Sequence, residues 1–560
     1  MKRFLLFAAL ITFTVTAYSQ HHEYYFKFKI NERSDLITLA RTVSIDNVQG
    51  NEVYAYANDK EMLDFIKLGI MYEMLPNPGT LISPKMSDNI DEIKDWDVYP
   101  TYDGYVTMMN QFATSYPNLC RIVNAGPTVQ NRAILFAVIS DNVTQHEAEP
   151  QFLYTSSMHG NETTGYVLML HLIDYLLTNY GTDPQVTNLV NNEEIWINPL
   201  ANPDGTYHGG NNTVSGATRT NANGIDLNRN FPDPAEGPNP TGPWQPETIA
   251  MMNLAIENHF VMSWNFHGGT EVVNYPWDTW PRLTADNNWW IYVSRRYADT
   301  VHVYAPSNYM NLFHNGITNG YEWYRVVGGR QDYMCYFQHG RECTIELSDA
   351  YILPPSQLPA HWNYNYRSFL NYMQEALNGI TGMVKDSVTL QPVYSRVFIA
   401  GHDIDSSFVY SDSTFGKYYR LIYAGTYDLT FSAPGYYTKT ITGVYAKNDS
   451  TTVLNVLLKP ITAGISKNGN GIPSEYMLYQ NYPNPFNPVT TINYDLPVSG
   501  FSRLVVYDIL GKEISILVSE KQTAGKYKVQ WDASNYPSGV YFYKLTADNY
   551  NGTRKLILLK

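Results

Sequence analysis

The spacing of apolar residues changes along the chain, and each change predicts a different kind of domain. Residues 24–30 alternate in a strand-like manner and residues 60–68 follow a helical spacing, which predicts a small α/β unit over residues 20–95. From about residue 102, apolar runs such as Phe152–Ser157 and Phe260–Phe266 alternate with helix-like stretches such as Tyr166–Leu177. This alternation predicts an α/β fold over residues 96–378, with a mixed, mainly parallel sheet and helices on both faces.

After residue 378 the pattern becomes one of short alternating strands separated by Gly and Pro turns. It predicts an all-β sandwich over residues 379–460. A polar linker over residues 461–473 then precedes a last β domain over residues 474–560, also expected to be a sandwich. Several domains are expected in any case, because 560 residues are too many for one hydrophobic core.

The first 19 residues have a basic tip and a short apolar run that ends in small residues. Because the run is shorter than a bilayer span, a cleaved export signal over residues 1–19 is favoured over a membrane anchor. The three cysteines offer no disulfide framework; Cys335 and Cys343 could pair or remain free thiols. The net charge of −14 argues against a nucleic-acid partner, since such partners are bound by clustered Lys and Arg.

Three residues form a candidate metal site. His159 and Glu162 make a His-x-x-Glu pair, and His267 lies about a hundred residues further on, followed by two glycines. One carboxylate and two imidazoles leave a fourth tetrahedral position open for water, as catalytic zinc requires. His159 and His267 each follow an apolar strand, so both should lie at one edge of the sheet, where open α/β folds bind their ligands.

A His-x-x-Glu pair alone carries little weight in a chain with 13 histidines. Stronger evidence comes from the motifs around this pair, which are Asn202–Gly205, Arg219–Pro232, Phe266–Asp278 and Thr344–Leu347. In this order they resemble the zinc metallocarboxypeptidases, and most closely the regulatory (N/E) subfamily, over roughly residues 100–375. The resemblance implies one zinc ion and an exopeptidase that hydrolyses the C-terminal peptide bond and releases single residues.

The same resemblance implies a role for each of five further residues. Glu346 corresponds to the general base, and Arg219 to the arginine that stabilises the oxyanion. Asn228 and Arg229 correspond to the pair that holds the terminal carboxylate of the substrate. Tyr324 corresponds to the mobile tyrosine that closes over the bound terminus.

The resemblance also suggests a preference for basic C-terminal residues. Asp278 and Gln331 correspond to the residues that bind the side chain of a C-terminal Lys or Arg in the regulatory subfamily. The chain departs from that subfamily at Glu271 and Arg330, where apolar residues are usual. If Arg330 lies beside the pocket, it could neutralise Asp278 and shift the preference towards neutral or acidic termini.

The flanking domains carry resemblances of their own. Residues 20–95 occupy the position of the propeptide of the digestive carboxypeptidases, which covers the active site until it is cut, although a permanent packing domain is an equal alternative. Residues 379–460 resemble the transthyretin-like domain of the regulatory carboxypeptidases. Residues 474–560, which include the run Asn484–Pro488, look like the C-terminal sorting domain of type IX secretion cargo. That likeness implies recognition by secretion machinery and export through the periplasm of an outer-membrane bacterium to the medium or the cell surface.

The expected partners are therefore peptide or protein C-termini and the secretion machinery, and the chain is expected to be a monomer. Two alternatives stay open. One applies the same chemistry to apolar C-termini or to cell-wall peptides. The other is an inactive surface binding protein, against which the presence of all three ligands together with Glu346 and Arg219 argues.

Overall fold

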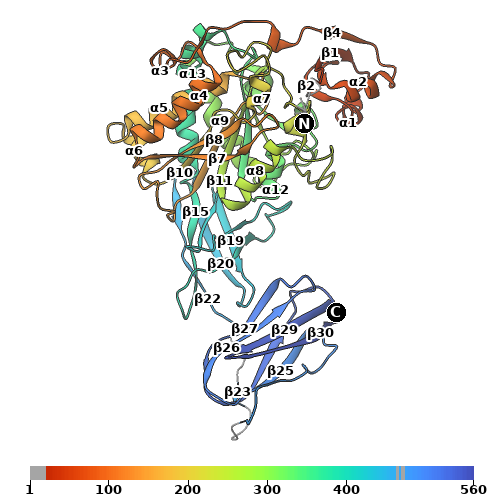
Figure 1. Cartoon of the computed structure of the whole chain (residues 1–560), viewed down its shortest axis with the longest axis vertical. Helices are drawn as coiled ribbons and strands as arrows, with labels where there is room; N and C mark the ends of the chain where they lie inside the picture. The colour runs from red at the N-terminus through yellow and green to blue at the C-terminus, as the bar shows by residue number, and fades with distance from the viewer. Residues whose placement is uncertain (1–20, 462–465, 468–472) are drawn as a thin grey trace, which may run out of the picture. The chain divides into compact units, whose positions relative to one another are not determined.

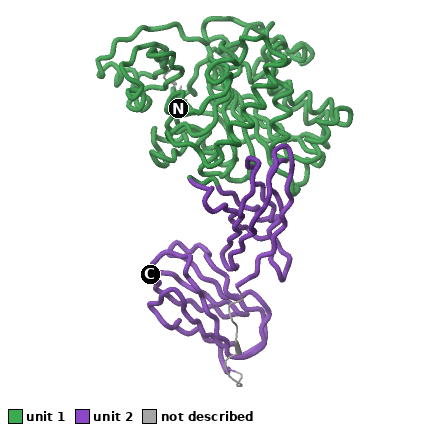
Figure 2. The backbone as a smooth tube through the Cα atoms, turned by 180° about the vertical axis from the view of Figure 1, so that it is seen from behind, with its two compact units in different colours: residues 1–377, 405–407 green, residues 378–404, 408–560 purple. Residues whose placement is uncertain are grey.

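The computed structural model describes residues 21–461, 466–467 and 473–560. The predicted export signal over residues 1–19 lies outside this range. The chain divides into two units, one running up to residue 377 and including residues 405–407, the other holding residues 378–404 and 408–560 (Figure 2). Within the described residues, no helix has the length and apolar character needed to cross a lipid bilayer.

The first unit begins with a small domain, here called the N-terminal module (residues 21–81). Its four strands lie in the order β2-β3-β1-β4, so that β2 is an edge strand. Apolar side chains of this sheet and of α2, among them Phe26, Ile45 and Phe65, form a separate core. The bounds are β1 (Tyr24–Lys29), α1 (Asp35–Leu39), β2 (Ser44–Gln49), β3 (Glu52–Ala57), α2 (Asp59–Ile66) and β4 (Tyr72–Leu75).

The rest of the first unit is built around an eight-stranded sheet in the order β13-β12-β14-β11-β9-β10-β8-β7. Figure 1 labels β7, β8, β10 and β11 of this sheet. Four of its seven strand pairs are parallel and three antiparallel, as expected for a mixed sheet. The strands are β7 (Cys120–Pro127), β8 (Ala133–Ile139), β9 (Gln151–Ser156), β10 (Glu194–Asn198), β11 (Phe260–His267), β12 (Thr270–Tyr275), β13 (Ile317–Asn319) and β14 (Arg341–Ser348).

Helices cover both faces of this sheet, because its strands are apolar on both sides. Leu153 of β9 belongs to the cluster formed with α8 and α12, whereas the neighbouring Tyr154 packs against Phe369 of α13 on the opposite face. The predicted α/β fold is therefore confirmed. The longer helices are α4 (Tyr102–Ser115), α5 (Thr164–Asn179), α6 (Pro184–Val190), α8 (Pro246–Glu257), α9 (Asn287–Tyr304), α12 (Arg330–Tyr336) and α13 (Leu358–Glu375). Short elements complete the unit: β5 (Met86–Ser87), α3 (Ile90–Ile93), β6 (Tyr99–Pro100), α7 (Pro203–Thr206), α10 (Leu312–Asn315), α11 (Gly320–Trp323), and the 3-10 turns η1 (Pro78–Thr80), η2 (Leu227–Arg229) and η3 (Pro355–Gln357).

The second unit contains only β-strands among its described residues. One pair of sheets has the orders β18-β15-β21, with β22 also on β15, and β17-β16-β19-β20 around its own apolar cluster. Its strands are β15 (Gly379–Asp386), β16 (Arg396–Ile399), β17 (Val409–Tyr410), β18 (Lys417–Arg420), β19 (Gly425–Ser432), β20 (Lys439–Ala446), β21 (Thr451–Val453) and β22 (Val456–Leu458). A second pair, β23-β28-β25-β24 and β27-β26-β29-β30, surrounds another cluster. Its strands are β23 (Ser466–Lys467), β24 (Met477–Leu478), β25 (Val489–Leu496), β26 (Gly500–Tyr507), β27 (Glu513–Gln522), β28 (Gly525–Asp532), β29 (Gly539–Ala547) and β30 (Tyr550–Leu558).

Candidate metal centre and active site

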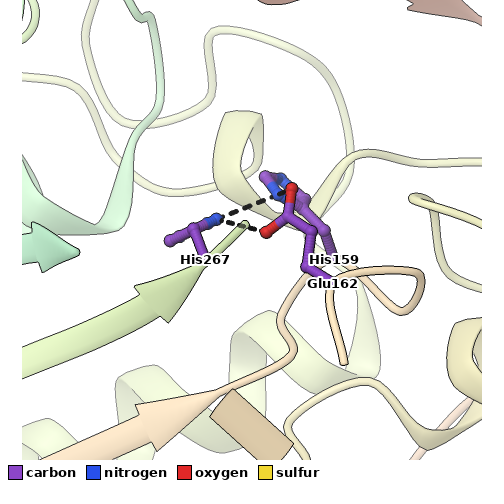
Figure 3. A group of neighbouring side chains, drawn as sticks. All are labelled: His159, Glu162 and His267. Carbon is purple, nitrogen blue, oxygen red and sulfur yellow. Dashed lines mark hydrogen bonds and ion pairs between the residues drawn. The ribbon is translucent and has the colours of Figure 1, made fainter. Parts of the chain in front are cut away.

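The three predicted ligands meet at the ends of two neighbouring strands (Figure 3). His159 and Glu162 lie in the loop between β9 and α5, and His267 is the last residue of β11, which pairs with β9. His159 Nδ1 lies 2.8 Å from Glu162 Oε1 and 3.0 Å from His267 Nδ1, and His267 Nδ1 lies 2.8 Å from Glu162 Oε2. All three side chains are buried. Their donor atoms are thus close enough to share one ion.

The outward-facing nitrogen of each imidazole is held in place. His159 Nε2 lies 3.0 Å from Asp226 Oδ1, and His267 Nε2 lies 2.7 Å from the side-chain amide of Asn265. The Asp226 carboxylate can accept from Nε2–H and so fixes the orientation and tautomer of a histidine that binds metal through Nδ1, whereas Asn265 fixes the position of the His267 ring. Two nitrogens and one carboxylate with an open fourth position are the ligand set of catalytic zinc, so the residues present fit that ion.

Electrostatics favour the protonation states that a metal requires at Glu162 and His267, and act in the opposite direction at His159. Burial lowers the pKa of His267 to about 4, which leaves its imidazole neutral at pH 7. Burial alone would raise the pKa of Glu162, but His159 and His267 hold it well below its usual range. The pKa of His159 is raised, because Glu162 and Asp226 outweigh the opposing effects of burial and Arg219.

Backbone packing explains why the ligand loop needs glycine and why the Asn202–Gly205 motif accompanies it. A Cβ atom on Gly160 would lie 2.3 Å from the carbonyl carbon of Gly205, so only glycine allows the two loops to touch. Asn202 Nδ2 donates to the carbonyl oxygens of Met158 and Thr220, both at 3.2 Å. These contacts join the loop that carries His159 to the loop that carries Arg219.

Glu346 lies on β14, directly beside His267 in the parallel register of β11 and β14. The residue is buried, and its Oε2 has no hydrogen-bond partner within the described part of the chain. Burial, reinforced by Glu162 and Asp46, raises the pKa of Glu346 well above its usual range. A carboxyl group with a raised pKa beside a metal site is suited to accept and return a proton.

Of the two predicted arginines, Arg219 lines the cavity and Arg229 does not. Arg219 Nε donates to Asp226 Oδ2 at 3.0 Å, and its Nη1 lies 3.2 Å from Glu162 Oε1. Arg229 and Asn228 lie in η2, whose first turn is capped by Asp226 Oδ1, 2.8 Å from the Asn228 amide. Arg219, Asn228, Tyr324 and Glu346 line one cavity with the three ligands.

A second part of this cavity contains Asp278 and Asn274. Asp278 Oδ1 accepts hydrogen bonds from Asn274 Nδ2 at 3.1 Å and from Gln331 Nε2 at 3.0 Å. The other amide atoms, Asn274 Oδ1 and Gln331 Oε1, are buried and have no partner among the described residues. Burial raises the pKa of Asp278 to about 7.

The expectation that Arg330 neutralises Asp278 is wrong. The Arg330 side chain is fully buried and forms a two-pronged ion pair with Glu342, with N–O distances of 2.9 and 3.0 Å. Residues 330 and 331 are consecutive in α12, so their side chains leave the helix about 100° apart. Glu271, the other departure, accepts a hydrogen bond from the Met310 amide and does not line the cavity. Neither departure removes the charge of the pocket.

Sequence reasoning missed several residues of the site. Asp226 and Asn265 orient the histidines, and Asp46 and Tyr351 line the cavity. Asp226 lies inside the Arg219–Pro232 motif, two residues before Asn228, so its position in the run was a usable signal. No signal in the sequence marked Asp46, because its place in the cavity depends on contacts between residues that are far apart in the chain. Cys335 and Cys343 are buried free thiols, which settles the alternative left open for them.

Together, the sheet, the buried His-Glu-His cluster and the nearby carboxyl group define a metal-dependent hydrolase centre. Comparison with known proteins agrees. The family model for zinc carboxypeptidases matches residues 105–368, and the model for the secretion system C-terminal sorting domain matches residues 480–559. Carboxypeptidase M of Mus musculus is 33% identical over 360 residues, which cover 60% of this chain and 79% of that protein.

Two further relatives give the same result. The carboxypeptidase N catalytic chain of Mus musculus is 32% identical, with 61% of this chain and 82% of the relative covered. Human carboxypeptidase D is 38% identical over 344 residues, or 59% of this chain. The match spans about a quarter of the length of the carboxypeptidase D relatives. The chain belongs to the zinc carboxypeptidase family.

Proposed function

We propose that the chain is an exported zinc carboxypeptidase that removes single C-terminal residues, with a preference for arginine and lysine. The observation that carries the proposal is the convergence of His159, Glu162 and His267 with the buried Glu346, whose Oε2 has no partner among the described residues, in one cavity. An inactive binding protein would have no chemical use for a buried carboxyl oxygen without a partner, because such an atom costs free energy.

A zinc ion held by His159, Glu162 and His267 would polarise the scissile carbonyl and lower the pKa of water. Glu346 would take a proton from the attacking water on its carboxylate and deliver it to the leaving amine. Its position beside His267 in the β11–β14 register supports this role. The partner bonds of Asp226 and Asn265 would keep both imidazoles oriented while the proton moves.

Arg219 would stabilise the oxyanion of the tetrahedral intermediate, a task for a fixed positive charge in a dry site. Asn228 and Arg229 would bind the terminal carboxylate, for which the planar guanidinium of arginine can donate two parallel hydrogen bonds. Tyr324 lines the same cavity and would close over the bound residue. These assignments explain why the enzyme would act only at a free C-terminus.

The preference for basic residues is supported by the hydrogen-bonding character of the pocket. Asn274 and Gln331 each donate one amide N–H to Asp278 Oδ1, while their own amide oxygens have no partner among the described residues. Three groups that can accept hydrogen bonds therefore lie together, which favours a ligand rich in donors. Arginine offers five N–H groups in a fixed plane and lysine three, so we expect arginine to be the better substrate.

The direct test is hydrolysis of a matched peptide set that differs only in the last residue: Arg, Lys, Phe, Leu, Glu or meso-diaminopimelate. The full chain is assayed as purified and after cleavage at the exposed linker around Leu81, with and without a zinc chelator. We expect chelator-sensitive release of Arg and Lys ahead of the others. Release of Leu or Phe alone would retain the enzyme and reject the pocket, and release of diaminopimelate alone would favour cell-wall peptides. No release from any peptide would refute the proposed function.

The pH dependence of this preference gives a second prediction. Asp278 must be ionised to attract a cation, and burial raises its pKa to about 7 in the free protein. Affinity for a basic terminus is therefore complete above that pH and falls about tenfold per pH unit below it. The measurement is the ratio of kcat/KM for an Arg-ending and a Leu-ending peptide, which cancels the titration of Glu346. A ratio that stays constant between about pH 5 and 8 would contradict this assignment.

The domain limits and the export route belong to the same proposal. Residues 96–378 would form the catalytic domain, 379–460 a transthyretin-like domain, 461–473 a linker and 474–560 the sorting domain. The match of residues 480–559 to a sorting-domain model supports recognition by secretion machinery, with delivery to the medium or the cell surface. Peptide and protein C-termini would be the substrates, and the chain would act as a monomer.

A further inference from the structure

A group of acidic side chains lies at the end of the central sheet opposite the candidate metal centre. Strand β10 lies between β8 and β9, antiparallel to β8 and parallel to β9, so the end of β8 meets the beginnings of β9 and β10. Asp141 follows β8, and Glu147 and Glu149 precede β9. Glu193 directly precedes β10. His159 lies beyond the other end of β9, so the two places share no residue.

Three of these carboxylates are close enough to share one ion. Asp141, Glu147 and Glu149 each offer an oxygen atom, and the three oxygens lie within 4.8 Å of one another. Calcium binds oxygen at about 2.3–2.6 Å, so oxygens around one calcium ion lie up to about 5 Å apart. Asp141 is exposed and the other two are half-buried, which leaves room for water among the six to eight oxygens that calcium takes.

The basic side chains at this end of the sheet are directed to a different carboxylate. His146, in the same loop, approaches Glu194 at 3.5 Å, and Arg121 approaches Glu194 at 3.7 Å. Within the described part of the chain, no Lys, Arg or His forms an ion pair with the three clustered carboxylates or with Glu193. The group therefore has no positive charge of its own.

Glu193 supplies an independent sign that a positive charge belongs here. It is fully buried, and neither of its carboxylate oxygens has a hydrogen-bond partner among the described residues. Its backbone runs beside the cluster, because the amide of the next residue, Glu194, donates to the carbonyl oxygen of Pro150 at 3.1 Å. Burial, reinforced by the charge of Glu149, raises the pKa of Glu193 well above its usual range. A buried carboxylate without a partner is costly unless a cation lies close to it.

The clustered carboxylates also oppose one another. Burial, together with Asp141 and Glu147, raises the pKa of Glu149 to about 7. The pKa of Asp141 is likewise raised, by burial and by Glu147. A divalent cation would turn this repulsion into attraction. The ligands are oxygen atoms only, without imidazole or thiolate, which selects a hard cation such as calcium over zinc.

We propose that Asp141, Glu147 and Glu149 bind one calcium ion, with Glu193 as a fourth carboxylate behind them, and that the ion fastens the loop between β8 and β9 to the beginning of β10. The inference goes beyond the proposed function and does not depend on hydrolysis. Calcium sites of extracellular modules have dissociation constants of about 0.1–1 mM, a range that suits an exported protein.

The test uses the full chain with zinc bound, transferred to calcium-free buffer. Equilibrium dialysis measures calcium binding, and thermal unfolding measures its effect on stability. We expect one calcium ion per chain and a rise in Tm of about 2–5 °C at about 10 mM calcium, because the ion binds only the folded protein. Magnesium at the same concentration is the control for charge screening and should produce less than about half of this rise. Zinc content is measured in parallel, to show that calcium has not entered the other metal site.

Glu149→Gln tests the assignment of the ligands. It removes one charged ligand and should weaken calcium binding at least about tenfold. It also removes the repulsion within the group, so its Tm in calcium-free buffer should equal or exceed that of the parent, which separates loss of the site from misfolding. Glu193→Gln should weaken binding by about tenfold through the lost charge alone. Glu257→Gln is the matched control, because Glu257 is exposed at the end of α8 and outside the group, and it should respond to calcium as the parent does.

Three results would overturn the inference. The first is the absence of calcium binding and of any rise in Tm in the parent chain. The second is an equal rise with magnesium, which would indicate general screening of charge. The third is unchanged calcium binding in Glu149→Gln or Glu193→Gln, which would place the ion elsewhere or remove the fourth carboxylate from the site. Peptide hydrolysis can succeed or fail in each case, so the proposed function is judged separately.

Discussion

Replacing Glu346 with Gln is expected to lower kcat by about 10²–10⁴-fold, the usual contribution of a general base. The amide has nearly the same shape as the carboxyl group but cannot accept the proton from water. Because the three metal ligands are other residues, zinc content and peptide binding should remain close to those of the parent chain. The measurements are single-turnover release of C-terminal Arg from the chain cut near Leu81 and metal content by elemental analysis.

The pattern of results matters more than the loss alone. A loss of zinc along with activity would mean that Glu346 supports the metal site, and its assignment as the base would be wrong. The same conclusion would follow if kcat changed less than tenfold. We expect Glu346→Gln to fold normally, since a neutral amide at a buried site avoids the cost that burial imposes on a carboxylate there.

Replacing Asp278 with Ala should remove the preference for basic residues. The variant loses a buried charge partner, a change that costs about 3–5 kcal/mol, so kcat/KM for an Arg-ending peptide should fall on the order of 100-fold or more. A Leu-ending peptide needs no such partner and should be cleaved at a rate within about tenfold of the parent. The measurement is kcat/KM of the cut chain for the two peptides in one assay.

Glu271→Gln provides the control for that experiment. Glu271 lies on β12, the strand that precedes Asp278. Its carboxylate accepts a hydrogen bond from the Met310 amide and does not line the cavity. Its substitution should leave the ratio between the two peptides unchanged. An equal fall for both peptides in Asp278→Ala would indicate a structural role for Asp278 and reject it as the specificity residue.

The strands of the central sheet could be predicted from the sequence because both faces of that sheet are covered, which gives strands such as β9 and β11 unbroken apolar runs. Strand β2 could not. Its two apolar residues, Ile45 and Val48, are three positions apart, which breaks the period of two that marks a strand. The bulge at Asp46 supplies the extra residue and explains the irregular spacing. The alternating pattern of a strand is therefore missing at Asp46, where β2 contributes a side chain to the cavity.

The candidate site likewise contains residues whose positions could be predicted from the nearby sequence and residues whose positions could not. His159 and Glu162 are close in sequence, and the strands before His159 and His267 are adjacent and parallel, so their meeting followed from strand order. The partners of Arg330 did not follow from sequence. Because Arg330 is next to Gln331 in the sequence, a position beside the Asp278 pocket was expected for it. The helical turn of α12 directs the Arg330 side chain towards Glu342 instead. Neighbours in a helix face different surroundings, and only the fold shows which.

Asp226, Asn228 and Arg229 share the single turn at η2, and Asp226 also joins His159 to Arg219. The side-chain pocket is built elsewhere, from Asp278 after β12 and Gln331 in α12. The two regions nevertheless meet, because the amide of Arg330 in α12 donates to Asn228 Oδ1 at 2.9 Å. Substitutions at connected positions are in general not additive, so evolution or redesign that changes the choice of terminal residue is expected to require compensating changes at the turn that carries Asn228.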